Sequence, residues 1–202
     1  VNARPPVPTQ ARHVLGHMVA ETVLGALTGT LPERVLAESA TPLWILSAQS
    51  SGSGADKPFS YTFFMGGGMG ASARLDGLSA TIFPGGVRGT PVEVVETQSP
   101  IRFLQKELRP DSGGPGTHRG GLGQIVKLFV DRPHAWMLPM WFGHFQYPAS
   151  GLFGGLPGAT GSGTIAVGGE SGEVVALAPV GEYTVPPDSV VTLLLPGGGG
   201  FG

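Results

Sequence analysis

The chain has 202 residues, of which 41% are hydrophobic, so it can bury one substantial core. Its net charge is −2 and its 12 Lys and Arg residues form no basic stripe, which argues against nucleic acid as a partner. The absence of cysteine excludes disulfides, thiolate metal sites and a cysteine nucleophile, and it fits a cytoplasmic protein. No apolar run reaches the roughly 18 residues of a membrane span.

Residues 10–28 are predicted to form an amphipathic helix. Apolar residues and one threonine recur at helical spacing, namely Leu15, Met18, Val19, Thr22, Val23, Ala26 and Leu27. His13, His17 and Glu21 form a second stripe, roughly opposite the first, and we expect this polar stripe to face solvent or a partner. Two imidazoles and a carboxylate at this spacing could also share a metal ion, so His13 and His17 are weak candidate ligands.

The composition of the chain then changes twice. A short helical turn is predicted at Pro32, and the small polar residues of 47–58 predict a loop. The aromatic run 59–65 predicts a buried strand. This divides the chain into a helical segment 1–46, a loop 47–58 and a β-rich segment 59–202.

Short β-prone runs, separated by glycine or proline, fill the β-rich segment. They are 92–96, 101–108, 124–130, 136–142, 174–177 and 190–195. The last run has no polar alternation, which is typical of a strand buried on both faces. We therefore expect a β-rich α+β fold, with one N-terminal helix followed by strands in a sandwich- or barrel-like arrangement.

Residues 66–71, Gly-Gly-Gly-Met-Gly-Ala, formally match a dinucleotide-binding fingerprint. The residues after them do not form the amphipathic helix that should hold the phosphate, and the chain has no phosphate-binding loop of the G-x-x-x-x-G-K-[ST] type. A close approach of two backbones is the better interpretation of these glycines.

The loop 109–123 concentrates charged residues in a Gly/Pro frame. Arg109, Asp111, His118 and Arg119 are the candidate catalytic residues, because arginine can clamp a carboxylate or carbonyl and histidine can move a proton near neutral pH. The alternative is a structural turn in which Asp111 pairs with an arginine and caps backbone amides. His134 and His144 lie in an aromatic-rich region, where we expect core or interface roles.

The order of several motifs resembles the hydantoinase B/oxoprolinase family. These motifs are Gly66-Gly67-Gly68-Met69-Gly70-Ala71, Asp76-Gly77-Leu78-Ser79-Ala80-Thr81, Thr90-Pro91-Val92-Glu93, Arg109-Pro110-Asp111-Ser112-Gly113-Gly114 and Arg119-Gly120-Gly121-Leu122-Gly123. The resemblance extends over residues 1–202 and corresponds to the C-terminal third to half of such a chain.

This resemblance implies a component of an ATP-dependent cyclic amide hydrolase in a hetero-oligomer. A hydantoinase A/oxoprolinase A-like ATPase partner, which binds ATP and Mg, would activate a small cyclic amide, and the B-type component would act on the activated ring. A divalent metal is expected in the N-terminal part of the family's chains, which this sequence does not include. Two alternatives stay open: an acetone or acetophenone carboxylase-type subunit, and a non-catalytic structural and docking module.

Overall fold

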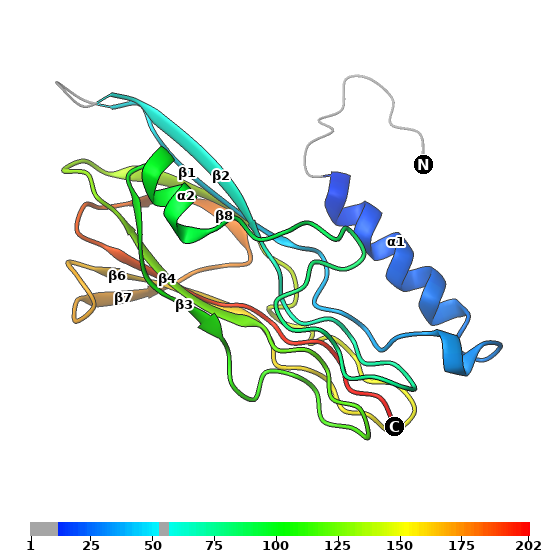
Figure 1. Cartoon of the computed structure of the whole chain (residues 1–202). Coiled ribbons are helices and arrows are strands. Elements are labelled where there is room, and N and C mark those ends of the chain that lie inside the picture. The colour runs from blue at the N-terminus through cyan, green and yellow to red at the C-terminus, as the bar shows by residue number, and fades with distance from the viewer. Residues whose placement is uncertain (1–11, 53–56) are drawn as a thin grey trace.

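The computed structural model describes residues 12–52 and 57–202, and it consists of two antiparallel β-sheets with two helices beside them (Figure 1). The helices are α1 (Arg12–Ala26) and α2 (Val92–Gln98), and a 3-10 turn spans Pro32–Arg34. The strands are β1 (Trp44–Ser50), β2 (Phe59–Met65), β3 (Ile101–Leu108), β4 (Gln124–Val130), β5 (Trp136–Trp141), β6 (Ser162–Val167), β7 (Glu173–Ala176), β8 (Val180–Val185) and β9 (Val190–Leu194).

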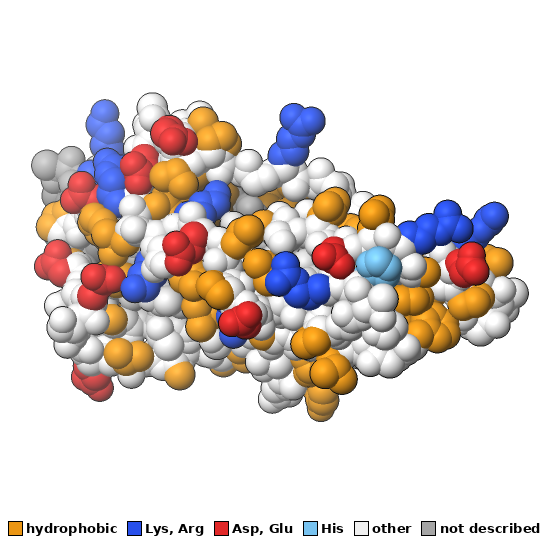
Figure 2. Space-filling view, turned by 60° about the horizontal axis from the view of Figure 1, so that its bottom comes forward, with side chains coloured by type: hydrophobic (Ala, Val, Ile, Leu, Met, Phe, Trp, Pro, Cys, Tyr) orange, Lys and Arg blue, Asp and Glu red, His pale blue; other side chains and the backbone are white. Residues whose placement is uncertain are grey.

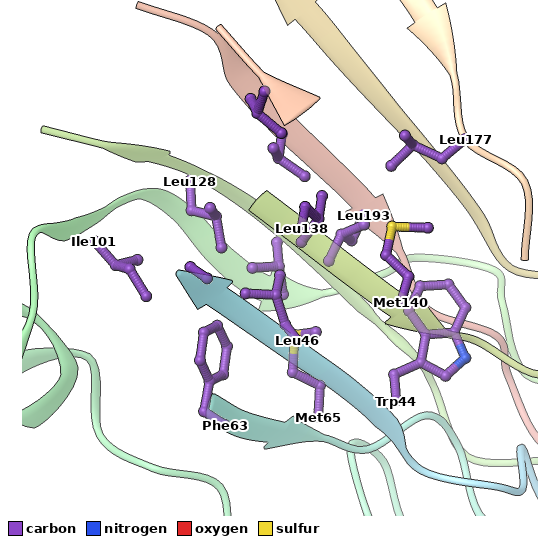
Figure 3. Close-up of a cluster of buried hydrophobic side chains, with 14 of the residues drawn as sticks. Trp44, Leu46, Phe63, Met65, Ile101, Leu128, Leu138, Met140, Leu177 and Leu193 are labelled. Carbon is purple, nitrogen blue, oxygen red and sulfur yellow. The ribbon is translucent and has the colours of Figure 1, made fainter. Parts of the chain in front are cut away.

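The two sheets pack face to face as a β-sandwich. One sheet has the strand order β2-β1-β5-β8 and the other has the order β3-β4-β9-β6-β7. Leu46 on β1, Leu138 on β5 and Leu193 on β9 are all fully buried and belong to one hydrophobic cluster between the sheets (Figure 3). This confirms the expected β-rich α+β fold and selects the sandwich over the barrel.

Alternation along the strands builds this core. Every second residue of β4 is buried, and β5 follows the same pattern, as expected for strands with one face toward a partner sheet. Strand β9 lies between β4 and β6, and three of its five residues are buried. The apolar run 190–195 therefore forms a central strand.

Several predicted elements differ from the structure. Residues 92–96 were expected to form a strand, and this prediction is wrong, because they belong to helix α2, which begins directly after Pro91. Proline has a fixed φ that suits the start of a helix, and Val95 alone is buried in α2, so the β-branched residues do not decide the outcome here. Strand β1 extends to Ser50 and so includes part of the predicted loop 47–58; there the Ser47 hydroxyl hydrogen-bonds the Thr62 hydroxyl of β2 at 2.7 Å.

Helix α1 and the 3-10 turn are where the sequence predicts them, but the prediction of which face of α1 is buried is wrong. Leu15 is 61% exposed and Val23 is 53% exposed, whereas His17 is 9% exposed. Figure 1 shows α1 standing beside the sandwich rather than on either sheet. Spacing predicts that a helix has two different faces, but only the neighbouring segments decide which face is covered.

Extended segments, most of them rich in glycine, leave one end of the sandwich and lie side by side (Figure 1). We call them the glycine bundle, and they are residues 36–41, 66–81, 109–123, 149–161 and 196–202. Segment 196–202 is their common neighbour: Gly68 donates a backbone hydrogen bond to Pro196 at 3.0 Å, Gly114 to Gly198 at 2.8 Å, and Leu152 to Gly200 at 3.0 Å. Backbone contacts between extended segments therefore hold this part of the molecule together.

Glycine is required where these backbones touch. A Cβ on Gly68 would fall on the carbonyl oxygen of Gly121, and a Cβ on Gly197 would fall on the carbonyl oxygen of Ser112. The same crowding places glycine at the axis of the collagen triple helix. The glycines of 66–71 therefore serve a close approach of backbones, as the sequence indicated.

Candidate functional site

The loop 109–123 folds back on itself within the glycine bundle. The Arg109 N–H donates to the Gly123 carbonyl at 2.9 Å at the base of the loop, and the Gly120 N–H donates to the Gly114 carbonyl at 2.9 Å farther along. Residues 115–119 form the tip. The four candidate catalytic residues are therefore divided between the base of the loop and its tip.

Arg109 lies at the base and contacts backbone carbonyls. Its guanidinium donates to the carbonyl oxygens of Thr160 at 2.7 Å and Leu195 at 3.2 Å, which ties three chain segments together. Burial lowers the pKa of Arg109, but the guanidinium group of arginine stays charged in proteins. This geometry is the one expected of a positioning residue.

Asp111 lies at the turn that follows. Its φ is +55°, in the left-handed region that aspartate tolerates better than most residues, and its side chain is exposed. The next residue, Ser112, is buried; its hydroxyl donates to the Arg109 carbonyl at 2.7 Å and accepts from the Gly123 N–H at 2.9 Å. The base of the loop is thus fixed by short-range hydrogen bonds.

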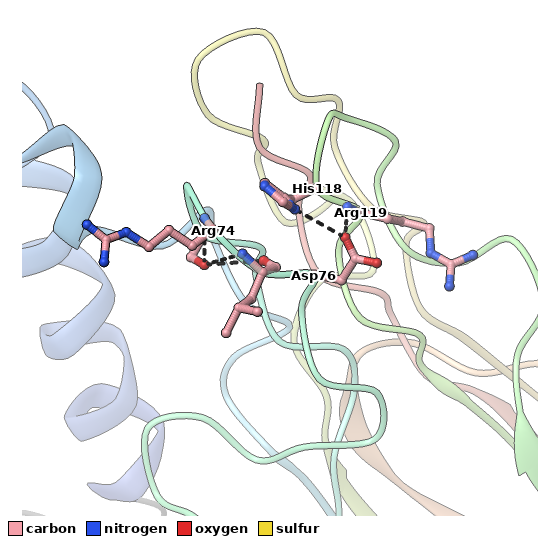
Figure 4. A network of polar contacts seen from close by, with 6 residues as sticks. Arg74, Asp76, His118 and Arg119 are labelled. Atoms are coloured by element: carbon pink, nitrogen blue, oxygen red, sulfur yellow. Dashed lines mark hydrogen bonds and ion pairs between the residues drawn. The ribbon is translucent and has the colours of Figure 1, made fainter.

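His118 and Arg119 lie at the tip, together with Asp76 from segment 66–81 (Figure 4). An Asp76 carboxylate oxygen accepts the Arg119 backbone N–H at 2.8 Å and lies 3.7 Å from His118 Nδ1. The Arg119 guanidinium points away from His118 in Figure 4. The tip thus presents an imidazole and an arginine head on a rigid frame.

Asp76 was not among the residues selected from the sequence. The signal was the Asp76-Gly77 pair, because a short acidic residue before glycine is typical of a turn that bonds to a neighbouring backbone. A Cβ on Gly77 would collide with the Met69 and Gly121 backbones, so the turn has to lie against the loop 109–123. The Asp76-Gly77 pair predicts a turn, but no local pattern in the sequence shows which segment this turn contacts.

A second group of polar residues surrounds a pocket of about 300 Å³ beside α1. Its lining includes Glu21 of α1, Glu38 of segment 36–41 and His144, which follows β5. Glu21 accepts the Ser39 N–H at 3.2 Å, and Glu38 accepts the Ser150 N–H at 2.8 Å. Glu21 is one of the stripe residues expected to face solvent or a partner, and it faces this pocket instead.

Burial of its carboxylate raises the pKa of Glu21 to about 7, although hydrogen bonding to Ser39 offsets part of this effect; the charge of nearby Glu38 raises the pKa further. A carboxyl group with this pKa exchanges protons near neutral pH, as general acids and bases do. Sequence spacing singled out Glu21, but it could not show that the side chain would be largely buried.

His144 is held in an unusual geometry. Its φ is +57°, and its Nδ1 lies 2.8 Å from the Tyr147 carbonyl oxygen. Because a carbonyl only accepts, Nδ1 carries the hydrogen and Nε2 of the neutral ring is an acceptor. Nε2 is buried and has no hydrogen-bond partner among the described residues. The expectation of a core or interface role for His144 did not include this pocket.

The weak metal candidates are not brought into a ligand set. The side chain of His13 lies outside the described residues, and His17 is buried with its Nε2 beside Gly85. Among the residues that the structure describes, no three His, Asp or Glu side chains are grouped closely enough to share a metal ion.

The face of the molecule seen in Figure 2 has no large patch of one charge. On the face seen in Figure 2, Lys and Arg side chains are interspersed with Asp and Glu and with hydrophobic side chains. In the described parts of the chain, no helix has both the length and the hydropathy needed to cross a bilayer.

A family model and several known proteins match this chain. The model of the Hydantoinase B/oxoprolinase family covers residues 1–202. A Pseudomonas sp. (strain NS671) protein, named as the B-type subunit of a "Putative D-/L-hydantoinase", is 31% identical over 202 residues, which are 98% of this chain and 33% of the relative. The acetone carboxylase alpha subunit of Xanthobacter autotrophicus is 39% identical over 98 residues, which are 46% of this chain and 12% of the relative.

A solved structure has the same fold. The ATP-dependent caprolactamase of Pseudomonas jessenii aligns with a TM-score of 0.78 and 24% identity, and the alignment covers all of this chain and 36% of that one. The sequence therefore spans about a third or less of the chains that it matches here.

Proposed function

Because the chain belongs to the hydantoinase B/oxoprolinase family, we propose that it is part of the B-type component of an ATP-dependent cyclic amide hydrolase. The observation that carries this proposal is the family match over residues 1–202, together with 31% identity to the Pseudomonas hydantoinase relative over 98% of the chain. In this function an ATPase-fold partner subunit binds ATP and Mg and phosphorylates the ring amide, and the B-type component acts on the activated ring.

The chemistry left to the B-type component is modest. An amide nitrogen is a poor leaving group, and phosphorylation of the amide oxygen turns the problem into attack of water on an activated carbon. What remains is to position the reactants and to stabilise developing charge. A rigid loop with an exposed cation and an imidazole is suited to that task.

We assign the four candidate catalytic residues of loop 109–123 two kinds of role. At the tip, Arg119 contacts the activated substrate or its phosphoryl group and His118 moves a proton, with Asp76 orienting the imidazole. At the base, Arg109 and Asp111 hold the loop in shape. The hydrogen bonds of Arg109 to two backbone carbonyls and the left-handed conformation of Asp111 support this division.

The first test is the substrate dependence of ATP turnover by the native complex, purified under mild conditions with every polypeptide identified by mass spectrometry. We expect hydantoin, 5-oxoproline or caprolactam to stimulate ADP release, with ring-opened product formed in step. A chain that copurifies with no ATPase-fold subunit, or a complex that no cyclic amide stimulates, contradicts the proposal.

The second test is Arg119→Ala in the same complex. Loss of one charge-assisted hydrogen bond should lower amide-dependent kcat/KM about 10- to 100-fold. Arg74→Ala is a matched control, because Arg74 is also an exposed arginine in the glycine bundle and pairs with exposed Glu33 at 3.6 Å. We expect the control to stay within about twofold of wild type; an Arg119 variant that behaves like the control contradicts the assigned role.

An acetone carboxylase-type reaction is the second candidate, and the 39% identity to the Xanthobacter autotrophicus alpha subunit favours it. In this reaction a phosphorylated enol joins activated bicarbonate. ATP turnover that requires both a ketone and bicarbonate, and that ignores cyclic amides, selects this candidate over the first.

A further inference from the structure

The pocket beside α1 is part of a longer groove. A second cavity of about 460 Å³ shares Met18, Glu38, Thr41 and His144 with it. The second cavity continues along the loop after β5, past Phe145 and Tyr147. The groove is therefore large enough for a small molecule with a polar end and an apolar chain.

The charged side chains in the described lining of the pocket are all acidic. Two carboxylates and one imidazole line the 300 Å³ pocket, and its lining contains no lysine or arginine from the described residues. Each carboxylate accepts a backbone N–H, from Ser39 or from Ser150, and neither forms an ion pair within the described parts of the chain. Two carboxylates with no cationic side chain beside them in the described lining favour a ligand that carries a positive charge and N–H donors.

The other lining residues restrict the ligand further. Met18 and Thr22 of α1, Leu36 of segment 36–41 and Leu152 of segment 149–161 surround the carboxylates with apolar and weakly polar surface. The apolar side chains of the pocket can cover an alkyl chain, and its carboxylates can bind a cation at one terminus of that chain. A terminal ammonium group supplies three N–H donors and one positive charge.

We propose that the pocket lined by Glu21, Glu38 and His144 binds a primary ammonium group on a short alkyl chain, such as the amine released when a lactam ring is opened. Identification of the ligand as the ring-opened product rests on the proposed function, whereas the affinity for an alkylammonium ion follows from the pocket alone. The carboxylates pair with the ammonium group, and the apolar side chains cover the alkyl chain.

Near and below the pKa of Glu21, binding of a cation is coupled to release of a proton. The titratable groups that line the pocket are Glu21 on α1, Glu38 in segment 36–41 and His144 after β5, and His17 lies one turn before Glu21 on the same helix. Burial holds the pKa of Glu21 at about 7, so near pH 6 most molecules carry its proton. A bound ammonium ion favours the charged carboxylate, and the proton is released to solvent.

The experiment is calorimetric titration of the native complex with n-pentylammonium chloride, and with sodium pentanoate as the charge-reversed probe. We expect the amine to bind and the carboxylate not to bind. Glu21→Gln should weaken amine binding at least about tenfold at pH 8, since it removes the charge but keeps the shape of the side chain. Glu33→Gln, which alters an exposed glutamate outside the pocket, should have no effect.

Proton release at pH 6 gives a second measure of amine binding. Titrations in two buffers of different ionisation enthalpy should show release of up to about one proton in wild type and none in Glu21→Gln. Equal binding of pentanoate, or amine binding that Glu21→Gln leaves unchanged, overturns the proposal. Amine binding in a complex that no cyclic amide stimulates supports the pocket while rejecting the proposed function, so the two failures are distinguishable.

Discussion

In the β-sandwich, side chains fill the space between the two sheets, whereas in the glycine bundle the backbones themselves are in contact. Leu46 on β1 and Leu138 on β5 are fully buried, and their volume sets the distance to the second sheet. In the bundle, Gly68 and Gly197 have no side chain, and neighbouring carbonyls occupy the place where one would be. The sandwich tolerates exchange of one apolar residue for another of similar volume, but the bundle tolerates no added atom at these positions.

This difference bears on function. A set of extended segments joined by backbone hydrogen bonds has little freedom to rearrange, because moving one segment breaks bonds to its neighbours. Polar residues placed at its edge, such as Asp76, His118 and Arg119, therefore keep a fixed relative position. Helix α1 is different, since Met18, Glu21, Thr22 and Gly25 line a pocket, while apolar residues such as Leu15 and Val23 are exposed.

The largest expected effect is from Gly68→Ala. The added Cβ would overlap the Gly121 carbonyl, which accepts the Gly198 N–H at 3.0 Å, so neither backbone can move without losing hydrogen bonds. We expect a loss of at least about 4 kcal/mol in the free energy of unfolding, above the usual range for overpacking. Denaturant unfolding followed by circular dichroism measures it.

Gly16→Ala is the matched control for that variant. Gly16 is in α1, and a Cβ added there would meet no described atom within 4 Å, so alanine should stabilise the helix by up to about 1 kcal/mol. Equal effects of the two substitutions would show that backbone contact does not hold the bundle together.

A smaller effect is expected in the sandwich. Leu138→Ala removes a fully buried side chain and leaves a cavity, which should lower the free energy of unfolding by about 3 kcal/mol. Leu104→Ala on β3, where the side chain is 50% exposed, should change it by well under about 1 kcal/mol. If Leu138→Ala costs no more than Leu104→Ala, side-chain volume does not control the spacing of the sheets.

The smallest expected effect concerns Glu21 of α1, and it depends on pH. Glu21 has a pKa of about 7 in the folded chain against an ordinary 4.5, so the folded state binds more protons than the unfolded state between these values, and stability falls as pH rises through this window. Glu21→Gln should therefore raise the free energy of unfolding at pH 8 by at most about 3 kcal/mol relative to wild type and have little effect near pH 4. Unfolding curves at both pH values measure this difference, and a gain that is the same at both contradicts the assigned burial.

Much of the fold follows from local patterns. The β-prone runs of β4 and β5 and the aromatic run of β2 predicted these strands, and in the structure each has one face buried against a partner sheet. The strands β1, β6 and β8 were not predicted as strands, since their small or polar residues become extended only through pairing with neighbours. Helix α2 shows the opposite case, in which valines suggested a strand and Pro91 began a helix.

The candidate site was only partly accessible from the sequence. Loop 109–123 was found because charged residues stand out in a glycine-rich frame, and its four candidate residues stay a prediction. Their division between base and tip depends on Arg109 reaching Thr160 and Leu195, which are far away in the chain. The position of Asp76 and the pocket beside α1 arise entirely from such long-range contacts.

By itself the sequence determined the family, the absence of cysteine chemistry, and the close approach of backbones at the glycines of 66–71, because these depend on residue identity and order. The tertiary structure decided which backbones those glycines bring together, which face of α1 is covered, and that the Glu21 carboxyl lies in a pocket with a raised pKa. The physical reason is the difference between local and long-range interactions. The spacing of residues along the chain encodes the periodicity of one helix or strand. Burial and electrostatic environment depend on segments, distant in the sequence, that fold against that element.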